Sequence, residues 1–256
     1  MITSVLRESP PPGAGAADPI PRLELADWAS RYGLVAGITT AGRGFSLALS
    51  GPEPVGAAVD RWRAFQELFR PRFPTVVFSR QVHGTQVRWY DPVPAGWLIG
   101  EGWDGHATGT PGTLLTISVA DCIPVYLVEP RSGAVALVHA GWRGAVGGIL
   151  GRGAELLASV ANTPVSSIVI HCGIGICGAC YEVGSEVANA LGLGVAEGSK
   201  ARVDLRSHLA AQAWALGIRE VSVSPFCSAH DAELHSHRAS GGKAGRMVAY
   251  LGRPKT

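Results

Sequence analysis

The sequence has few features of a membrane, secreted or nucleic-acid-binding protein. No segment approaches about 18 consecutive apolar residues, and the N-terminus lacks a basic region followed by an apolar run and a small-residue cleavage site. We therefore expect a cytoplasmic protein that makes no contact with a membrane. Charged residues make up only 16% of the chain, the net charge is +2, and neither Lys nor Arg forms a run. This charge pattern argues against nucleic acid as a partner and favours small molecules.

Cysteines are few and odd in number, which argues against a framework of disulfide bonds and for thiols or metal ligands. The five are Cys122, Cys172, Cys177, Cys180 and Cys227. Three of them are close in sequence between residues 172 and 180, where a metal site is one interpretation. The chain has no second Cys-x-x-Cys motif to complete such a site, so buried thiols are the favoured interpretation.

Hydrophobic residues make up 46% of the 256 residues, enough for a large buried core. Residues 1–22 are rich in Pro, Gly and Ala without apolar periodicity, and are predicted to form a flexible tail. Short β-branched runs predict strands, and helical spacing predicts a helix over 145–160 and another that begins at the N-cap Asp204 and ends near residue 216. We expect a single α/β domain over residues 23–256, with α+β as the alternative. The predicted strands cover residues 75–79, 114–119, 123–128, 134–138 and 167–170.

Three residues able to bind a metal each follow or end a predicted strand: His83, Cys122 and His139. Strand ends carry loops that build sites on a rigid scaffold, so the fold could bring these ligands together. Two imidazoles and one thiolate suit a catalytic zinc ion, with a fourth position left for water or substrate. The separations of 39 and 17 residues are too wide for a zinc finger, and spacing alone leaves open that each residue is separately structural.

The segments that contain these residues resemble the laccase-domain or YfiH-like family, whose members are described as multicopper polyphenol oxidases and as purine nucleoside phosphorylases. The resemblance runs from about Gly33 to Leu251. It is carried by Gln81-Val-His-Gly84, Asp104-Gly105 before Thr108, Ala120-Asp-Cys-Ile-Pro124, His139-Ala-Gly-Trp-Arg-Gly144, Cys180-Tyr-Glu-Val-Gly184, Val203-Asp-Leu205 and Gly245-Arg-Met247.

This resemblance implies mixed β-sheets flanked by helices and one ion, zinc or alternatively copper, held by His83, Cys122 and His139. It also implies that phosphate cleaves adenosine, inosine, guanosine and methylthioadenosine, and that adenosine is deaminated. We expect Cys122 and His139 to take part in catalysis and the protein to act as a monomer on purine nucleosides and phosphate.

Further site residues are expected from their chemistry and their place in these motifs. Asp121 adjoins Cys122 and is a candidate to orient a histidine ligand or move a proton, with a turn-capping role as the alternative. Arg43, Arg143 and Arg238 are candidates to bind substrate, with structural ion pairs as the alternative. Three further histidines are interpreted as surface or hydrogen-bonded residues, with a ligand role as the alternative: His106, His235 and His237.

Three other functions are consistent with the same residues. Two His and one Cys also describe a blue-copper site, although a laccase needs about eight further His ligands and this chain has eight His in all. Cys122 and His139 could instead form the nucleophile and base of a hydrolase. For such a hydrolase the family resemblance implies editing of peptidoglycan precursors. A structural metal would need a fourth protein ligand, and the family motifs supply only three.

Overall fold

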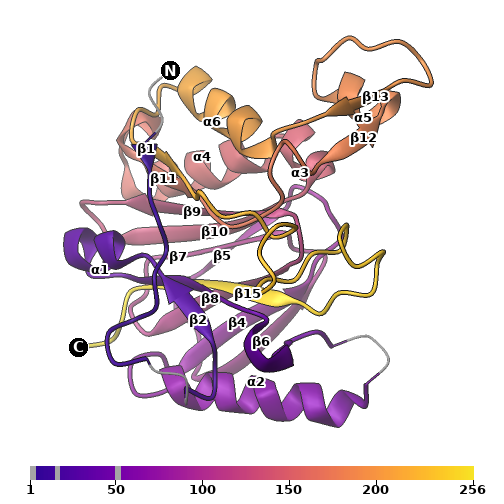
Figure 1. Ribbon diagram of the computed structural model, residues 1–256. Helices are drawn as coiled ribbons and strands as arrows, with labels where there is room; N and C mark the ends of the chain where they lie inside the picture. Colours follow the sequence, from indigo (N-terminus) through magenta and orange to yellow (C-terminus); the bar gives the residue numbers. More distant parts are fainter. Residues whose placement is uncertain (1–3, 15–17, 50–52) are drawn as a thin grey trace.

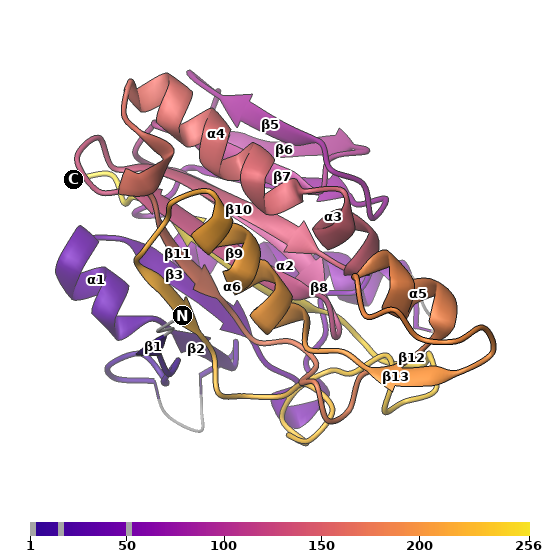
Figure 2. The same ribbon diagram turned by 90° about the horizontal axis from the view of Figure 1, so that it is seen from above.

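Two β-sheets pack face to face between outer helices (Figure 1, and Figure 2 from above). The computed structural model describes residues 4–14, 18–49 and 53–256. One sheet has seven strands in the order β1-β14-β11-β9-β10-β7-β5, and the other has six in the order β2-β3-β15-β8-β4-β6. Both mix parallel and antiparallel pairs, so the predicted single α/β domain with mixed sheets is confirmed.

The seven-stranded sheet lies above the six-stranded sheet in Figure 1. In spatial order its strands are β1 (Ser4–Val5), β14 (Val221–Val223), β11 (Val169–Cys172), β9 (Ile123–Glu129), β10 (Ala134–Ala140), β7 (Gly105–Thr108) and β5 (Val87–Tyr90). Those of the six-stranded sheet are β2 (Arg22–Glu24), β3 (Val35–Thr39), β15 (Met247–Gly252), β8 (Thr113–Val119), β4 (Thr75–Arg80) and β6 (Gly96–Glu101).

Helices cover the outer faces of both sheets. The helices α4 and α6 lie on the seven-stranded sheet, and α2 lies under the six-stranded one (Figure 1). None of the described helices has the length and hydropathy needed to cross a membrane. The α-helices are α1 (Ala26–Tyr32), α2 (Val55–Phe69), α3 (Trp142–Val146), α4 (Ile149–Ala161), α5 (Ser185–Ala190) and α6 (Leu205–Ala215), and the 3-10 turns are Gly42–Gly44 and Val165–Ser167.

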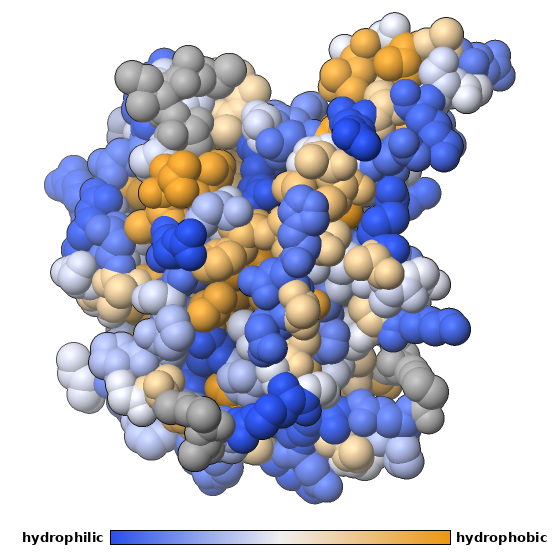
Figure 3. All heavy atoms as spheres, viewed as in Figure 1, coloured by the Kyte–Doolittle hydropathy of each residue, from blue (hydrophilic) through white to orange (hydrophobic). Residues whose placement is uncertain are grey.

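A small lobe projects from one end of the sandwich. It consists of α5 and the two-stranded antiparallel sheet of β12 (Glu182–Gly184) and β13 (Lys200–Arg202). Figure 3 shows hydrophobic residues on this lobe, while hydrophilic residues cover much of the rest of the same face. The lobe begins directly after Tyr181, so its first strand leads away from the site described below.

The central strands are buried on both faces, which explains their uninterrupted apolar sequences. In β9, Val125 and Leu127 pack toward the outer helices, whereas Tyr126 and Val128 pack against the other sheet. All four side chains are at most 1% exposed. Burying one such side chain contributes about 1.5–3 kcal/mol to folding, so these strands form a rigid support for the loops at their ends.

Most predicted elements are confirmed, and two differ in their bounds. The helix expected over 145–160 is broken into α3 and α4, because Gly148 adopts a left-handed conformation with φ of 80°. The strand expected from residue 167 begins instead at Val169, after a 3-10 turn. The helix α6 begins as predicted, and the Asp204 carboxylate accepts hydrogen bonds from the backbone N–H groups of Arg206 and Ser207.

The prediction of a flexible tail over residues 1–22 is wrong for the described part of that segment. The strand β1 pairs in parallel with β14, and the Glu8 carboxylate, 2% exposed, lies 3.0 Å from Nε2 of the buried His171. Ile20 is completely buried. Composition suggested disorder, but these contacts are made to residues more than 150 positions away and leave no local sequence pattern.

Candidate metal centre

Three strand ends bring His83, Cys122 and His139 together. His83 follows β4, Cys122 lies in the turn between β8 and β9, and His139 is near the end of β10. One ligand atom from each residue lies within 4.8 Å of the other two, and the two imidazole ring centres are 4.9 Å apart. The structure therefore brings together three candidate ligands that the sequence placed at separate strand ends.

A fourth residue, Asp104, holds the imidazole of His139 and the backbone of His83. Its Oδ1 accepts hydrogen bonds from His139 Nδ1, at 2.8 Å, and from the backbone N–H of His83, at 3.0 Å. Its Oδ2 accepts from the backbone N–H groups of Val82 and Gly84. Since Nδ1 of His139 is occupied by Asp104, the Nε2 atom is the one left for a metal.

The charges within this cluster support one another. Burial alone would raise the pKa of the Cys122 thiol, but the charge of His139 and hydrogen bonds from both histidines lower it to about 6. Burial would lower the pKa of His139, yet the Cys122 thiolate and Asp104 raise it to about 9. Burial likewise opposes ionisation of Asp104, but hydrogen bonds from His139, Gly84 and Val82 hold its pKa below the usual value. A thiolate is thus available near neutral pH, which is the form that binds metals.

The backbone around the ligands is tightly constrained. His83 has a φ of 60°, in the left-handed region that non-glycine residues rarely adopt, and three hydrogen bonds to Asp104 hold residues 82–84 there. A Cβ atom at Gly141 would lie 3.1 Å from both Cys122 Sγ and His83 Cδ2. The glycine of the His-Ala-Gly-Trp motif is therefore required by the close approach of two ligands.

The donor set fits a transition-metal ion. Two imidazole nitrogens and one thiolate suit zinc or copper, and a carboxylate behind one imidazole is the usual outer partner of such a ligand. Only three protein ligands converge among the described residues at this point, so a fourth position can take a substrate or water.

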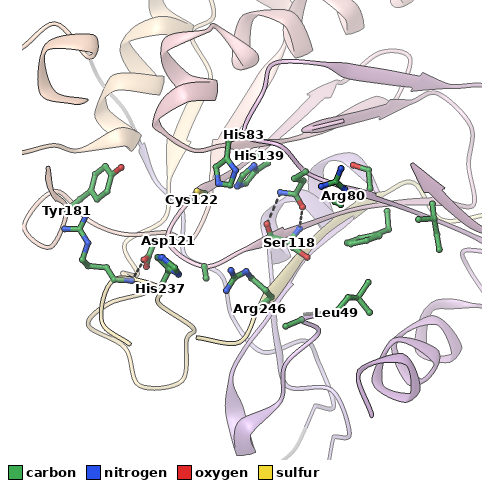
Figure 4. A pocket seen from close by; sticks show the side chains of 17 residues that line it. Leu49, Arg80, His83, Ser118, Asp121, Cys122, His139, Tyr181, His237 and Arg246 are labelled. Atoms are coloured by element: carbon green, nitrogen blue, oxygen red, sulfur yellow. Dashed lines mark hydrogen bonds between the residues drawn. The ribbon is translucent and has the colours of Figure 1, made fainter. Parts of the chain in front are cut away.

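All three ligands line a pocket of about 770 Å³, a size suited to a nucleoside. Figure 4 shows their side chains at one wall of the pocket, with Arg246 and Leu49 farther along it. The lining consists of Ala48, Leu49, Phe78, Ser79, Arg80, Gln81, His83, Ile99, Ser118, Ala120, Asp121, Cys122, His139, Tyr181, His237, Arg238 and Arg246.

Of the three arginines expected to bind substrate, only Arg238 lines this pocket. Its guanidinium lies over the Tyr181 ring, 5.3 Å from the centroid, and donates to the carbonyl of Glu182. Arg43 is exposed and donates to the carbonyl of Asp18, and Arg143 is exposed on α3 above the Trp142 ring. Neither Arg43 nor Arg143 belongs to the pocket lining.

Arg80, Gln81 and Arg246 are among the pocket residues that were not singled out from the sequence as site residues. Arg80 and Arg246 add positive charge to the lining, while the Gln81 side chain exchanges two hydrogen bonds with the backbone of Ser118. Gln81 and Arg246 both lie within the motifs that carry the family resemblance. Their place in these motifs was the sequence feature that could have identified them, because each is otherwise an ordinary polar side chain in a loop or at a strand end.

Asp121 lines the pocket, but its carboxylate has a different task from the one expected. It accepts hydrogen bonds from the Ser228 hydroxyl and the backbone N–H of Arg238, both at 2.7 Å. The carboxylate that orients a histidine ligand is Asp104, not Asp121. Asp121 instead joins the turn that contains Cys122 to the loop that carries Arg238, a contact that differs from both the histidine-orienting and the turn-capping roles considered from the sequence.

The three further histidines considered from the sequence have hydrogen-bonding or surface positions in the structure: His106, His235 and His237. His106 is completely buried between the Tyr90 hydroxyl and Ser79, and burial lowers its pKa to about 3. His235 Nε2 donates to the carbonyl of Phe45. His237 is exposed and lines the pocket without belonging to a group of potential metal ligands among the described residues.

A family model described as multi-copper polyphenol oxidoreductase laccase matches residues 51–254. The chain belongs to this family. The laccase-family protein is 39% identical over 181 residues to a purine nucleoside phosphorylase of Deinococcus radiodurans, an alignment that covers 68% of this chain and 69% of that protein.

Two crystal structures have the same fold as this laccase-family chain. YlmD from Geobacillus stearothermophilus is 29% identical, has a TM-score of 0.79 and is matched over 92% of this chain and 97% of that chain. The hypothetical protein YfiH of Bacillus licheniformis, at 22% identity, also has a TM-score of 0.79, with 92% and 99% covered. The family resemblance carried by the sequence motifs is confirmed.

Proposed function

We propose that this laccase-family chain is a zinc-dependent purine nucleoside phosphorylase. The observation that carries the proposal is the location of His83, Cys122 and His139 at the wall of a pocket that also contains arginine side chains. Relatives at 33–39% identity bear the name purine nucleoside phosphorylase, which supports the substrate class. The proposed substrates are adenosine, inosine, guanosine and methylthioadenosine, each with phosphate.

Different residues of the pocket are suited to different parts of the phosphorolysis reaction. When bound by His83, Cys122 and His139, zinc supplies a Lewis acid at the wall of the pocket. Arg238 and Arg246 are suited to hold the phosphate, because guanidinium groups form charge-assisted hydrogen bonds with its oxygens. A phosphate oxygen then forms a bond to C1′ of the ribose as the C1′–N bond breaks, and the bonding electrons leave with the purine, which takes up a proton.

Aromatic and apolar side chains of the lining suit the purine ring. Tyr181 and Phe78 line the pocket, and Phe78 is fixed by the Trp62 ring, whose centroid is 5.1 Å away. Leu234 and His235 lie outside the lining: Leu234 is buried, and His235 donates a hydrogen bond to the carbonyl of Phe45. The surface available to the base is therefore provided by Tyr181 and Phe78.

Deamination of adenosine is proposed as a second activity of the same pocket. Water would add at C6 of the purine and ammonia would leave, giving inosine. A Lewis acid close to bound water favours this addition, because it lowers the pKa of that water. The Asp104 carboxylate accepts the Nδ1–H of His139 and so keeps the His139 imidazole in one orientation during the reaction.

The two rival functions are less well supported by the geometry. A multicopper laccase needs a cluster rich in histidine, but the only other group of potential ligands among the described residues is three cysteines and one histidine. A thiol hydrolase would use the Cys122 thiolate beside His139 without a metal, which leaves His83 without a task.

The test is to incubate metal-quantified enzyme with adenosine, with and without phosphate, and identify the products. Adenine and ribose 1-phosphate, formed only with phosphate, are expected, together with inosine. Oxidation of a phenol by protein that contains stoichiometric copper and has a blue absorption band would favour the oxidase instead. Hydrolytic activity that survives complete removal of metal would favour the thiol hydrolase.

A further inference from the structure

A second cluster of metal-binding side chains lies outside the site described above. Cys177, Cys180, Cys227 and His230 each offer one ligand atom, and these four atoms lie within 4.8 Å of one another. The sequence alone favoured buried thiols here, because Cys177-x-x-Cys180 has no second Cys-x-x-Cys motif as a partner. The fold supplies that partner as Cys227 and His230, about 50 residues away.

Strand pairing explains why these two segments meet. β11 and β14 are parallel neighbours, with Cys172 opposite Val223, so the loops that follow them leave the same end of the sheet. Cys177 and Cys180 lie in the first loop, and Cys227 and His230 lie in the second. A parallel β-bridge between Gly175 and Cys227 continues the pairing into both loops. This pairing places Cys227 close to Cys177 and Cys180.

Hydrogen bonds hold the side chains of the cluster close together. Sγ of Cys180 lies 2.8 Å from Nε2 of His230, and the backbone N–H of Cys177 donates to Sγ of Cys227 at 3.3 Å. The structure contains no disulfide among the described cysteines. By contrast, Cys172, the remaining thiol of this region, is completely buried and belongs to the apolar core.

We propose that Cys177, Cys180, Cys227 and His230 bind a structural zinc ion. Three thiolates and one imidazole form one of the standard closed zinc sites, with four protein ligands and no position for a substrate. A tetrahedral ion with Zn–S bonds of about 2.3 Å holds its sulfur ligands about 3.8 Å apart. The four atoms of the cluster all lie within 4.8 Å of one another, and those of Cys180 and His230 are 2.8 Å apart. Binding of the ion would therefore open the Cys180–His230 pair and draw the more distant atoms closer together.

The position of this site indicates what the ion does. Tyr181 follows Cys180 and lines the substrate pocket, while Ser228 follows Cys227 and donates to Asp121. Arg238, farther along the second loop, lies over the Tyr181 ring. An ion that joins the two loops therefore fixes one wall of the pocket without contacting the substrate.

Metal counting can separate this site from the His83–Cys122–His139 site. Protein expressed with zinc and purified under reducing conditions is analysed for zinc per chain by mass spectrometry. The Cys122→Ala variant should retain one zinc, and His230→Ala should hold one zinc fewer than the wild type. His230 is exposed, which makes its replacement a mild change. Cys172→Ala is the matched control, because it removes a thiol outside the cluster and should keep the wild-type count.

A second measurement identifies the ligands. With Co²⁺ in place of zinc in the Cys122→Ala background, the thiolate charge-transfer band should weaken in Cys177→Ser, which removes one of three thiolates, and increase in His230→Cys, which adds a fourth. Absence of zinc from a folded Cys122→Ala variant would overturn the proposal, as would an unchanged zinc content in His230→Ala. A disulfide within the cluster of the freshly reduced, zinc-supplied protein would also overturn it.

Discussion

Two hydrogen bonds join Asp104 and His139. The Asp104 carboxylate accepts a hydrogen bond from His139 Nδ1 at 2.8 Å, and the Asp104 backbone carbonyl accepts one from the His139 N–H at 2.7 Å. Because the same carboxylate binds the backbone of residues 82–84, one residue positions both imidazole ligands. Asp104 is therefore a positioning residue of the metal centre.

Replacing Asp104 by Asn should lower zinc affinity by about 10- to 100-fold, the usual cost of losing an outer partner of a metal ligand. The amide NH₂ group of Asn cannot accept the hydrogen bonds that the backbone N–H groups of Val82 and Gly84 donate to Oδ2 of Asp104. Affinity is measured by competition with a chromophoric chelator. Asp121→Asn is the matched control, since that carboxylate contacts Ser228 and Arg238 but no ligand side chain. Equal affinities in the two variants would contradict the assignment.

Gly141→Ala should weaken zinc binding by roughly tenfold or more, comparable to disturbance of a ligand's outer contacts. The added methyl group would lie 3.1 Å from both Cys122 Sγ and His83 Cδ2, so at least one ligand must move. Gly56→Ala serves as the control, because nothing lies within 4 Å of a Cβ atom there. The same chelator competition, with thermal unfolding to check the fold, measures the effect. Retention of wild-type affinity by Gly141→Ala would show that the ligands have more room than the structure gives them.

In protein stripped of metal, Cys122 should react with iodoacetamide at unusually low pH. Its pKa of about 6 means that the reactive thiolate is lost below pH 6 and is fully formed above pH 7. Cys172, whose pKa burial raises to about 12, should stay unmodified over the same range. Peptide mass spectrometry after timed alkylation gives each rate separately. A midpoint near the ordinary thiol value for Cys122 would mean that His139 does not stabilise the thiolate.

Arg246→Ala should raise the KM for phosphate by about 10- to 100-fold, as expected for loss of a hydrogen bond to a charged group. Arg246→Lys should recover part of the loss, because it restores the positive charge but not the bidentate hydrogen bonds of a guanidinium group. Arg43→Ala is the control, since Arg43 is exposed and outside the pocket lining. Initial rates at varied phosphate distinguish these cases. An equal KM in the Arg246→Ala and Arg43→Ala variants would remove Arg246 from the phosphate site.

Local patterns predicted the central strands, because buried strands have long apolar sequences. They also placed His83, Cys122 and His139 at strand ends, but the family resemblance, and not the spacing, predicted that these residues form one metal site. Local patterns could not identify Asp104 as the partner of His139, since that contact depends on β7 pairing with β10. Asp121 was the natural candidate only because it adjoins Cys122 in sequence. The contact between Glu8 and His171 was missed for the same reason, as it joins residues 163 positions apart.

The most direct test of the central claim is zinc-dependent phosphorolysis of adenosine. Each protein is stripped with a chelator and reloaded with two equivalents of zinc, one for each proposed site. Adenine release in phosphate buffer is then measured for the wild type, Cys122→Ala and Cys172→Ala. We predict that activity disappears on stripping and returns with zinc in the wild type and Cys172→Ala, while folded Cys122→Ala stays inactive. Full phosphorolysis by Cys122→Ala, or by the stripped wild type, would contradict the account.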